Sequence, residues 1–483
     1  WDWMDQGLKQ DVPEVYRATS AHDHFYAYGG WWENAKGVRH DGNFCMNGLV
    51  ASDMTPHPGL NTIKYFYRNI HVEALDLSAN KFRITNWFDF SNAAGMVKGK
   101  WEILEDGRPV LKGEIGDLDI PARSAKDIQL DLGEFSPQPG KEYHITFSFA
   151  LLNDQFYASA GHELAWDQFR LPQSSNKGLG KINVTDSPKW KFVQAMLPYK
   201  TKREITVWGK DFSIVFDDIT GRLEKYYFHD EMLIKWGPQP DFWRVTTDND
   251  RGAEQEGNYV IKELALWENA SDWVIDEMTI EEQDNTIVVV ASGKLPVVGA
   301  EYTQTYIVYG DGTVDVTCSY KAGEMKLPIV PRLGTNMVVS PGYENLEWYG
   351  PGEYPTYIDR NVEKVGVYSS TVAGEWVDYS RPQENGYKSD TRWFKLTNNE
   401  GKGLLFTADS LIGFGASHYE RNNIKESSYS FELTAHPEIF LNVDHKQMGL
   451  GGTTSWGHRA LPLKDYRINN QDYSFSYRIS PLN

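Results

Sequence analysis

The chain has 483 residues and a formal net charge of −19 at pH 7. At roughly 100 to 150 residues per domain, about three domains are expected, each with its own core. The negative charge argues against nucleic acid and anionic membrane surfaces as partners, because both would repel this protein. A neutral substrate fits the charge better.

Cysteine content and hydropathy restrict the class of protein further. Cys45 and Cys318 lie far apart, so neither a disulfide framework nor a CxxC zinc site is expected. No apolar run approaches the roughly 18 residues needed to cross a bilayer, and a signal peptide further upstream would fall outside this sequence. We expect a soluble protein and leave its compartment open between cytoplasm and periplasm. The 17 Trp and 27 Tyr suit β-sandwich cores or sugar-stacking surfaces, and core positions are the commoner explanation.

Residues 1–68 differ in pattern from the rest and read as a strand, a long polar loop and a helix. The helix is expected from Pro56-His57-Pro58 onward, where Leu60, Ile63 and Phe66 recur near helical spacing. Proline in the first helical turn loses no hydrogen bond, because that N–H would be unpaired anyway. His22-Asp23-His24 has two metal-ligand side chains without a third in view, so a solvated loop is the better interpretation.

Residues 69–172 alternate between apolar and polar side chains, as strands with one buried face do. The pattern is clear at Val72–Leu77, Lys81–Ile84 and Tyr143–Phe149. Asp106-Gly107 supplies the positive φ that a tight hairpin needs. Some seven short strands fit into about 100 residues, which predicts an immunoglobulin-like β-sandwich.

A polar stretch at 171–178 has the composition of a linker, which we place at 173–204. Beyond it, Ile287–Val290 and Tyr306–Tyr309 read as buried strands, and Gly310-Asp311-Gly312 turns the second into the next strand. The segment 205–483 therefore predicts a large antiparallel β-sandwich, and the chain as a whole is expected to be mainly β.

Spacing alone specifies no chemistry in this chain. With 67 acidic residues, carboxylate pairs occur everywhere by chance, and neither GxSxG nor a P-loop is present. The pairs Gly29-Gly30 and Gly451-Gly452 mark sharp bends or close approaches, beside Trp31-Trp32 and Trp456 respectively. Tight turns are the ordinary interpretation of both pairs.

Longer motifs recur in order along the whole chain. They are Trp1–Gln6, Tyr28-Gly29-Gly30, Phe44–Pro58, Thr247–Asp250, Pro331–Gly334, Trp348 with Gly350 and Gly352 before Asp359-Arg360, Pro382–Gly386, and Met448–Gly452 before Ser455-Trp456. Together they resemble the C-terminal half of the large multidomain β-galactosidases of glycoside hydrolase family 2. The resemblance implies that residues 1–68 are the last strand, loop and helix of a catalytic (β/α)8 barrel. The immunoglobulin-like domain and a terminal sandwich of the β-galactosidase small-chain type would follow.

The resemblance also implies roles for four residues. Trp1 matches a tryptophan that closes the galactose pocket, at a barrel strand end where this fold places its chemistry. The Phe44 backbone carbonyl and the Asn47 side-chain oxygen match ligands of a sodium ion that orients a sugar hydroxyl. Trp456 matches a tryptophan that reaches from the terminal sandwich to stack on the sugar. The plainer alternatives are a barrel-core Trp1, a loop-capping Asn47 and an ordinary sandwich Trp456.

A retaining glycosidase needs two carboxyl groups about 5 to 5.5 Å apart. In the family that this chain resembles, both are glutamates on earlier barrel strands, so they precede Trp1. Most magnesium ligands and the third sodium ligand would also lie upstream. Trp31-Trp32-Glu33-Asn34 replaces the acidic-aromatic-Gly-Asp run that usually follows the Tyr-Gly-Gly motif. Two extra tryptophans there suit a subsite for a longer or modified galactoside.

We therefore expect the C-terminal part of a retaining β-galactosidase for terminal β-D-galactosyl residues, inert as an isolated chain. Its partners would be the N-terminal half of the same polypeptide or a separate large subunit, in a homo-oligomer. Two alternatives stay open. One is a non-catalytic carbohydrate-binding or scaffolding β-sandwich protein, and the other is the small subunit of a naturally split enzyme.

Overall fold

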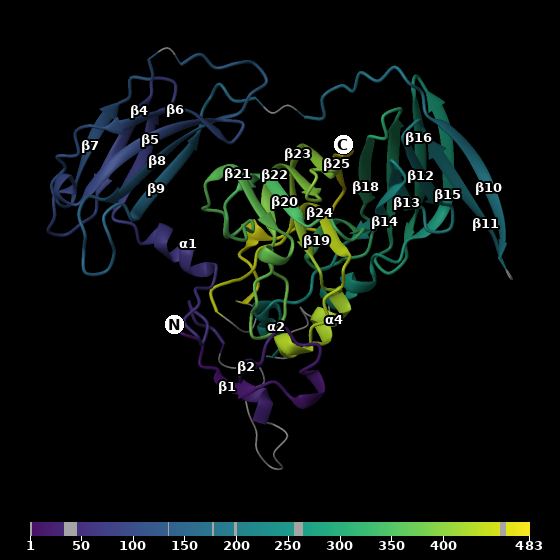
Figure 1. Cartoon of the computed structure of the whole chain (residues 1–483), viewed down its shortest axis with the longest axis horizontal. Helices are drawn as coiled ribbons and strands as arrows, with labels where there is room; N and C mark the ends of the chain where they lie inside the picture. The colour runs from purple at the N-terminus through teal and green to yellow at the C-terminus, as the bar shows by residue number, and fades with distance from the viewer. Residues whose placement is uncertain are drawn as a thin grey trace.

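The computed structural model describes residues 2–32, 46–133, 135–175, 178–197, 200–255, 264–454 and 460–483. Strands dominate the chain, as expected from its alternating pattern, and they fall into a small N-terminal segment, a seven-stranded unit and one large sheet (Figure 1). Within the described ranges, no helix has the length and apolarity needed to span a bilayer.

The N-terminal segment is a loose assembly of short elements. Strands β1 (Leu8–Asp11) and β2 (His24–Ala27) pair antiparallel, and Met4 forms an isolated parallel bridge with Val50. The predicted helix is present as α1 (Gly59–Phe66) and begins directly after Pro58. The segment packs on the large sheet through a buried apolar cluster that is mostly aromatic and that we call the aromatic cluster. It consists of Val12, Phe25, Ala27, Tyr28, Tyr429 and Phe431.

The seven-stranded unit has the strand count predicted for an immunoglobulin-like sandwich. One sheet has the order β3-β4-β7 and the other β6-β5-β8-β9. Asp106 and Gly107 both have positive φ, +46° and +79°, at the predicted hairpin between β5 and β6. The strands are β3 (Ile70–Asp76), β4 (Lys81–Asn86), β5 (Val97–Glu105), β6 (Arg108–Ile115), β7 (Ser124–Gln129), β8 (Tyr143–Leu151) and β9 (Glu163–Arg170).

The rest of the chain forms one antiparallel sheet of 16 strands that curls around a single large core. Short helices α2 (Asp248–Gln255) and α4 (Arg421–Glu426) lie beside it (Figure 1). The strands are β10 (Lys189–Leu197), β11 (Lys200–Trp208), β12 (Phe212–Asp217), β13 (Leu223–Phe228), β14 (Glu231–Asp241), β15 (Val274–Gln283), β16 (Thr286–Leu295), β17 (Ala300–Tyr309), β18 (Val314–Lys321), β19 (Arg332–Val339), β20 (Asn345–Pro351), β21 (Val365–Thr371), β22 (Lys388–Thr397), β23 (Gly403–Ser417), β24 (Ile439–Gln447) and β25 (Tyr473–Leu482).

Strand β10 and the start of β11 lie inside the range 173–204 that the composition assigned to a linker. Strand β10 pairs only with β11 and ends the path of the sheet. Edge strands often carry lysines on exposed positions, which discourages pairing with another chain, and Lys189 and Lys191 are exposed here. The linker-like composition belongs to the polar stretch at 171–178, and the predicted linker extends too far beyond it.

Several polar contacts join the seven-stranded unit to the large sheet, and one group of them meets at Glu142. The side chain of Glu142, at the start of β8, receives hydrogen bonds from Arg392 Nε and Nη2, both at 2.7 Å. Tyr349 donates its hydroxyl to the same carboxylate at 2.8 Å. Gly107 is needed here for a second reason, because a Cβ at this position would lie 2.7 Å from the Tyr349 ring.

Candidate functional site

The N-terminal segment and the large sheet meet at a cavity of about 270 Å³, which we call the junction cavity. It is lined from one side by the loop and helix that follow the first residues, and from the other by loops of the large sheet. Its lining includes Asp5, Met46, Gly48, His57, Gly59, Thr247, Asp248, Asn249, Pro355, Tyr357, Arg360, Tyr379, Gln383, Glu384, Asn385 and Leu450. Most motifs that carry the family resemblance therefore converge at one place.

Asp5 fastens the loop on the N-terminal side of the cavity. Its carboxylate is buried, accepts a hydrogen bond from Gly48 N at 2.7 Å and lies 2.8 Å from His57 Nε2. Gly48 is required here because a Cβ would lie 2.2 Å from the Asp5 backbone nitrogen. Across the cavity, the His57 ring lies against Tyr379, with centroids 5.2 Å apart. One carboxylate thus holds Gly48, the residue after Asn47, and His57, two residues before helix α1.

The opposite wall is built on the start of helix α2. Thr247 and Asp250 cap it reciprocally, with Thr247 N donating to Asp250 Oδ2 at 3.0 Å and Asp250 N donating to Thr247 Oγ1 at 3.2 Å. Asp248 and Gln383 exchange two hydrogen bonds of 3.0 and 2.8 Å. The motifs at 247–250 and 382–386 are therefore joined by side-chain contacts.

The glycine-rich motif at 448–452 forms the third part of this wall. Leu450 N and Gly451 N donate to the two oxygens of Asp359 at 3.0 and 3.1 Å. A Cβ on Gly451 would lie 2.0 Å from Asn249 Nδ2, so this glycine permits a close approach between its loop and helix α2. Asn249 Nδ2 also donates to the Leu450 carbonyl at 3.4 Å. The chain that leads toward Trp456 is thereby anchored at the junction cavity.

Of the four predicted site residues, Trp1, Phe44 and Trp456 lie outside the described residues. Asn47 is exposed and stands between Met46 and Gly48, which both line the junction cavity. Sequence reasoning did not single out Asp5, His57 or Asp359, although all three lie within quoted motifs.

The two histidines considered as possible metal ligands, His22 and His24, each pair with a carboxylate. His22 pairs with Asp378 at 3.0 Å and His24 with Asp11 at 2.9 Å, so the two imidazoles face different carboxylates. In the part of the chain that the structure describes, no three His, Cys, Asp or Glu side chains group around a possible metal ion.

Trp31, of the altered Trp-Trp-Glu-Asn run, packs into the aromatic cluster. Its ring lies 4.9 Å from Phe25 and 5.5 Å from Tyr429, centroid to centroid. Trp32 also packs against this cluster, whereas Glu33 and Asn34 lie outside the described residues. Both tryptophans thus help to seat the N-terminal segment on the large sheet.

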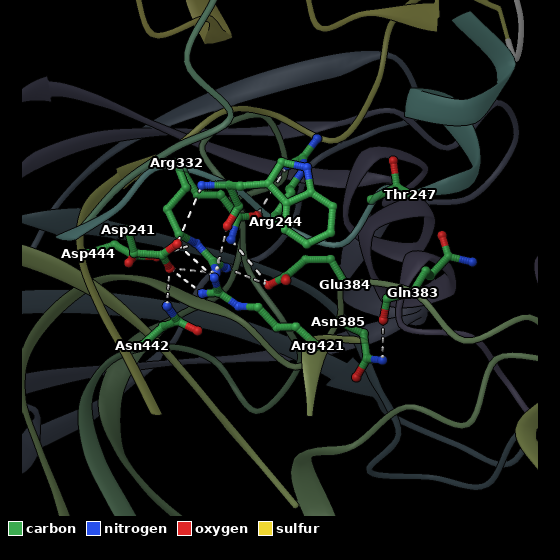
Figure 2. A network of polar contacts seen from close by, with 12 residues as sticks. Asp241, Arg244, Thr247, Arg332, Gln383, Glu384, Asn385, Arg421, Asn442 and Asp444 are labelled. Carbon is green, nitrogen blue, oxygen red and sulfur yellow. Dashed lines mark hydrogen bonds and ion pairs between the residues drawn. The ribbon is translucent and has the colours of Figure 1, made fainter. Parts of the chain in front are cut away.

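Behind the junction cavity, a buried network of charges centres on Arg332 (Figure 2). Arg332 pairs with Asp444 at 3.0 Å, with Glu384 at 2.9 Å and with Asp241 at 3.4 Å. Arg421 donates two hydrogen bonds to Asp241. Two arginines therefore face three carboxyl groups, and Arg332, Asp241 and Asp444 among them are fully buried.

The pKa values of two of these carboxyl groups are shifted in opposite directions. Burial favours the neutral form of Asp241, but Arg421 and Arg332 outweigh it and hold its pKa below the usual range. Burial raises the pKa of Asp444 to about 8, because Arg332 only partly offsets the burial and the neighbouring Asp241 and Glu384 add to it. At neutral pH, Asp444 holds its proton and the charges of the network balance. Gly334 admits Asp444, since a Cβ there would lie 2.0 Å from Asp444 Oδ1.

Comparison with known protein families agrees with this arrangement. Residues 1–72 match the family described as "Glycosyl hydrolases family 2, TIM barrel domain". Residues 82–172 match "Beta-galactosidase, domain 4", and residues 208–479 match "Beta galactosidase small chain".

Curated relatives align over the whole chain. A β-galactosidase of Priestia megaterium is 28% identical over 486 aligned positions, covering 100% of this chain and 44% of the relative. A β-galactosidase of Photobacterium profundum is 27% identical, covering 100% of this chain and 45% of the relative. A solved galactose 1-epimerase from Lactobacillus acidophilus covers 61% of this chain at 11% identity with a TM-score of 0.32, a likeness too weak to bear on fold or function.

The chain thus spans less than half the length of the curated relatives that it matches. The small-chain match alone covers more than half of the sequence, and the two other matches precede it in the family order. This chain belongs to the glycoside hydrolase family 2 β-galactosidases, as a part of them that ends a TIM barrel and carries domain 4 and the small-chain region.

Proposed function

We propose that this chain forms part of a retaining β-galactosidase that hydrolyses terminal β-D-galactosyl residues. The supporting observation is the junction cavity, where barrel-segment and sandwich motifs meet in a chain that aligns throughout with β-galactosidases. In this role the chain supplies a wall of the sugar site. The nucleophile and the acid/base, two glutamates of the barrel, come from the rest of the polypeptide or from a separate large subunit.

Trp1 and Trp456 are proposed to contact the sugar, and Phe44 and Asn47 to hold a sodium ion. In support, Asn47 is exposed between two residues that line the junction cavity, and its amide oxygen is the kind of ligand that hard cations prefer. The Asp359 contacts anchor the loop that leads toward Trp456 at the same cavity. A magnesium ion of the complete enzyme would take most of its ligands from outside this chain.

The decisive experiment compares the chain alone with the chain plus its missing part. The purified 483-residue chain should show no turnover of an aryl β-galactoside, because it lacks both glutamates. Co-expression with the preceding part of the enzyme should restore turnover, and the intact mass of the native protein would show whether one polypeptide or two are present. Hydrolysis by the chain alone, free of contaminating enzyme, would overturn the assignment of the glutamates.

A further inference from the structure

A second cavity, of about 260 Å³, opens on the large sheet on the other side of the loop 383–385. Residues Gln383, Glu384 and Asn385 line both this cavity and the junction cavity. Its floor comes from strands β14, β19, β24 and β23, which are neighbours in the sheet, and helix α4 forms one side. We call it the sheet cavity.

Three amide side chains stand in a row across the floor of the sheet cavity. Gln239 is the register partner of Asn336, and Asn336 is the register partner of Asn442. Directly opposite residues of an antiparallel pair point to the same face, so the three amides lie side by side. The row ends at Gly415, the partner of Asn442, where a Cβ would meet only Tyr387, at 3.6 Å. The missing side chain leaves room at that end of the row.

The amides are oriented so that donors and acceptors vary along the row. Arg222 Nη1 donates to Gln239 Oε1 at 2.8 Å, which leaves the Gln239 amide nitrogen to donate elsewhere. Asn442 Nδ2 donates to Asp241 Oδ2 at 2.6 Å, which leaves its oxygen to accept. Between them, Asn336 Oδ1 is buried and finds no hydrogen-bond partner among the described residues. Because Oδ1 itself is buried, Asn336 meets a ligand in the cavity through its amide nitrogen, which is a donor.

The charges and rings around the row restrict the chemistry of a ligand. Arg421 is engaged by Asp241 and Glu384 by Arg332, so these two charges are neutralised within the protein. Glu420 of the lining is exposed to solvent. Half-buried aromatic rings flank the amides, with Trp376 and Tyr419 4.6 Å apart between centroids. Amides match hydroxyl groups as both donors and acceptors, and flat rings cover the C–H faces of a pyranose.

We propose that the sheet cavity binds carbohydrate, and that its ligand is a neutral hexopyranose. The ring would lie between the amide row and the Trp376–Tyr419 pair, with the Asn336 amide nitrogen donating to one of its hydroxyl groups. This binding needs only residues of the described chain, so it does not depend on hydrolysis by the assembled enzyme.

The test is calorimetric titration of the purified chain with methyl β-D-galactopyranoside and methyl β-D-glucopyranoside. We expect at least one of them to bind. Asn336→Leu should lower the association constant at least tenfold while the melting temperature stays equal or rises, because the variant loses an unpaired buried acceptor. Trp376→Ala should lower the association constant roughly two- to tenfold, the range of a lost aromatic contact.

Two controls keep the result decisive. Trp87→Ala removes a half-exposed tryptophan of the seven-stranded unit and should leave sugar binding unchanged. Tyr379→Ala alters the junction cavity, so loss of binding in this variant alone would place the sugar there and not in the sheet cavity. The inference is wrong if neither glycoside binds. The inference is equally wrong if Asn336→Leu binds the sugar as tightly as the original chain does. It is also wrong if Tyr379→Ala loses sugar binding while Asn336→Leu retains it.

Discussion

Asp5 shows how a single buried carboxylate organises a loop that carries little secondary structure. The side chain is only 4% exposed, and its two oxygens serve two different stretches of chain, at Gly48 and at His57. A loop held in this way keeps Asn47 at the rim of the junction cavity without a strand or helix to support it. The position of the proposed sodium ligand thus depends on a residue more than 40 positions away in sequence.

Asp5→Ala should therefore lower the free energy of unfolding by about 1–3 kcal/mol, because it leaves a part-buried N–H without an acceptor. In the complete enzyme, both Asp5→Ala and Asn47→Ala should raise the sodium concentration at which galactoside binding is half-maximal. The matched control is Asp11→Ala, which breaks an Asp–His pair of similar length that is exposed to solvent. A sodium dependence unchanged in both variants would contradict the proposed role of this loop.

At Trp456 the expected effect is on substrate binding rather than on folding. In the complete enzyme, Trp456→Ala should weaken galactoside binding by roughly 0.5–1.5 kcal/mol or more, the scale of a lost aromatic contact. Steady-state kinetics across several galactosides provides the measurement. KM and kcat that both stay at their original values would exclude this tryptophan from the sugar site.

At the scale of elements, strands β14, β19 and β24 are joined through their side chains as well as their backbones. Asp241, Arg332 and Asp444 come from these three neighbouring strands and meet in the buried network (Figure 2). A protonated Asp444 avoids a third negative charge beside Arg332 and Arg421. Asp444 therefore remains protonated within the buried network at neutral pH.

This proton makes stability depend on pH with a defined sign. The pKa of Asp444 is about 8 in the folded chain and about 3.9 when unfolded. Between these values the folded state binds a proton that the unfolded state has released, so stability falls as pH rises. Asp444→Asn mimics the protonated form and should escape this loss.

The stability of Asp444→Asn relative to the original chain should thus increase from about pH 4 to about pH 8, by at most about 1.4 kcal/mol per pH unit. Denaturant unfolding at a series of pH values measures it. Asp117→Asn, on a carboxylate fully exposed to solvent, serves as the control and should show no such increase. A constant difference between Asp444→Asn and the original chain would show that Asp444 is ionised in the fold.

At the scale of the whole molecule, the seven-stranded unit is held to the large sheet by a small polar interface. Glu142 forms one part of it, with Arg392 and Tyr349 on the other side, and Glu163 with Lys364 forms another. Burial opposes ionisation of Glu142, but the hydrogen bonds from Arg392 prevail and lower its pKa. Glu142 and Arg392 therefore stabilise each other's charged form at this interface.

Glu142→Ala should cost about 3–5 kcal/mol of stability, because it leaves Arg392 partly buried without its counter-charge. Faster hydrogen exchange in strands β20 and β22 would locate the loss at the interface. Asp127→Ala removes an exposed pair with Arg83 and should change stability by less than about 1 kcal/mol. Equal effects of the two variants would show that the Glu142 contact contributes no more than a surface pair.

Local patterns predicted much of this fold. Helix α1, the seven short strands and the Asp106-Gly107 hairpin all follow from periodicity and turn chemistry, which act over a few residues. Strand β10 was missed because the linker recognised from the polar stretch 171–178 was extended over the later residues KWKFVQAML, which form the strand.

The candidate site could be predicted only in part. Motif resemblance pointed to the stretches that line the junction cavity, but not to the contacts between them. Asp5 meets His57 across 52 positions, and Asp359 meets Leu450 across 91. Such pairs leave no periodic signal in a single sequence, because their proximity is created by the packing of separate elements.

The aromatic cluster under the N-terminal segment also sets the order in which the molecule can assemble. Tyr28 donates its hydroxyl to the Ser428 carbonyl, 400 positions later, and its ring stacks on Tyr429. During synthesis from the N-terminus, this contact cannot form until nearly the whole chain has emerged from the ribosome. The segment that lines the N-terminal side of the junction cavity can therefore be seated only after residues 428–431 have been made, some 400 positions later.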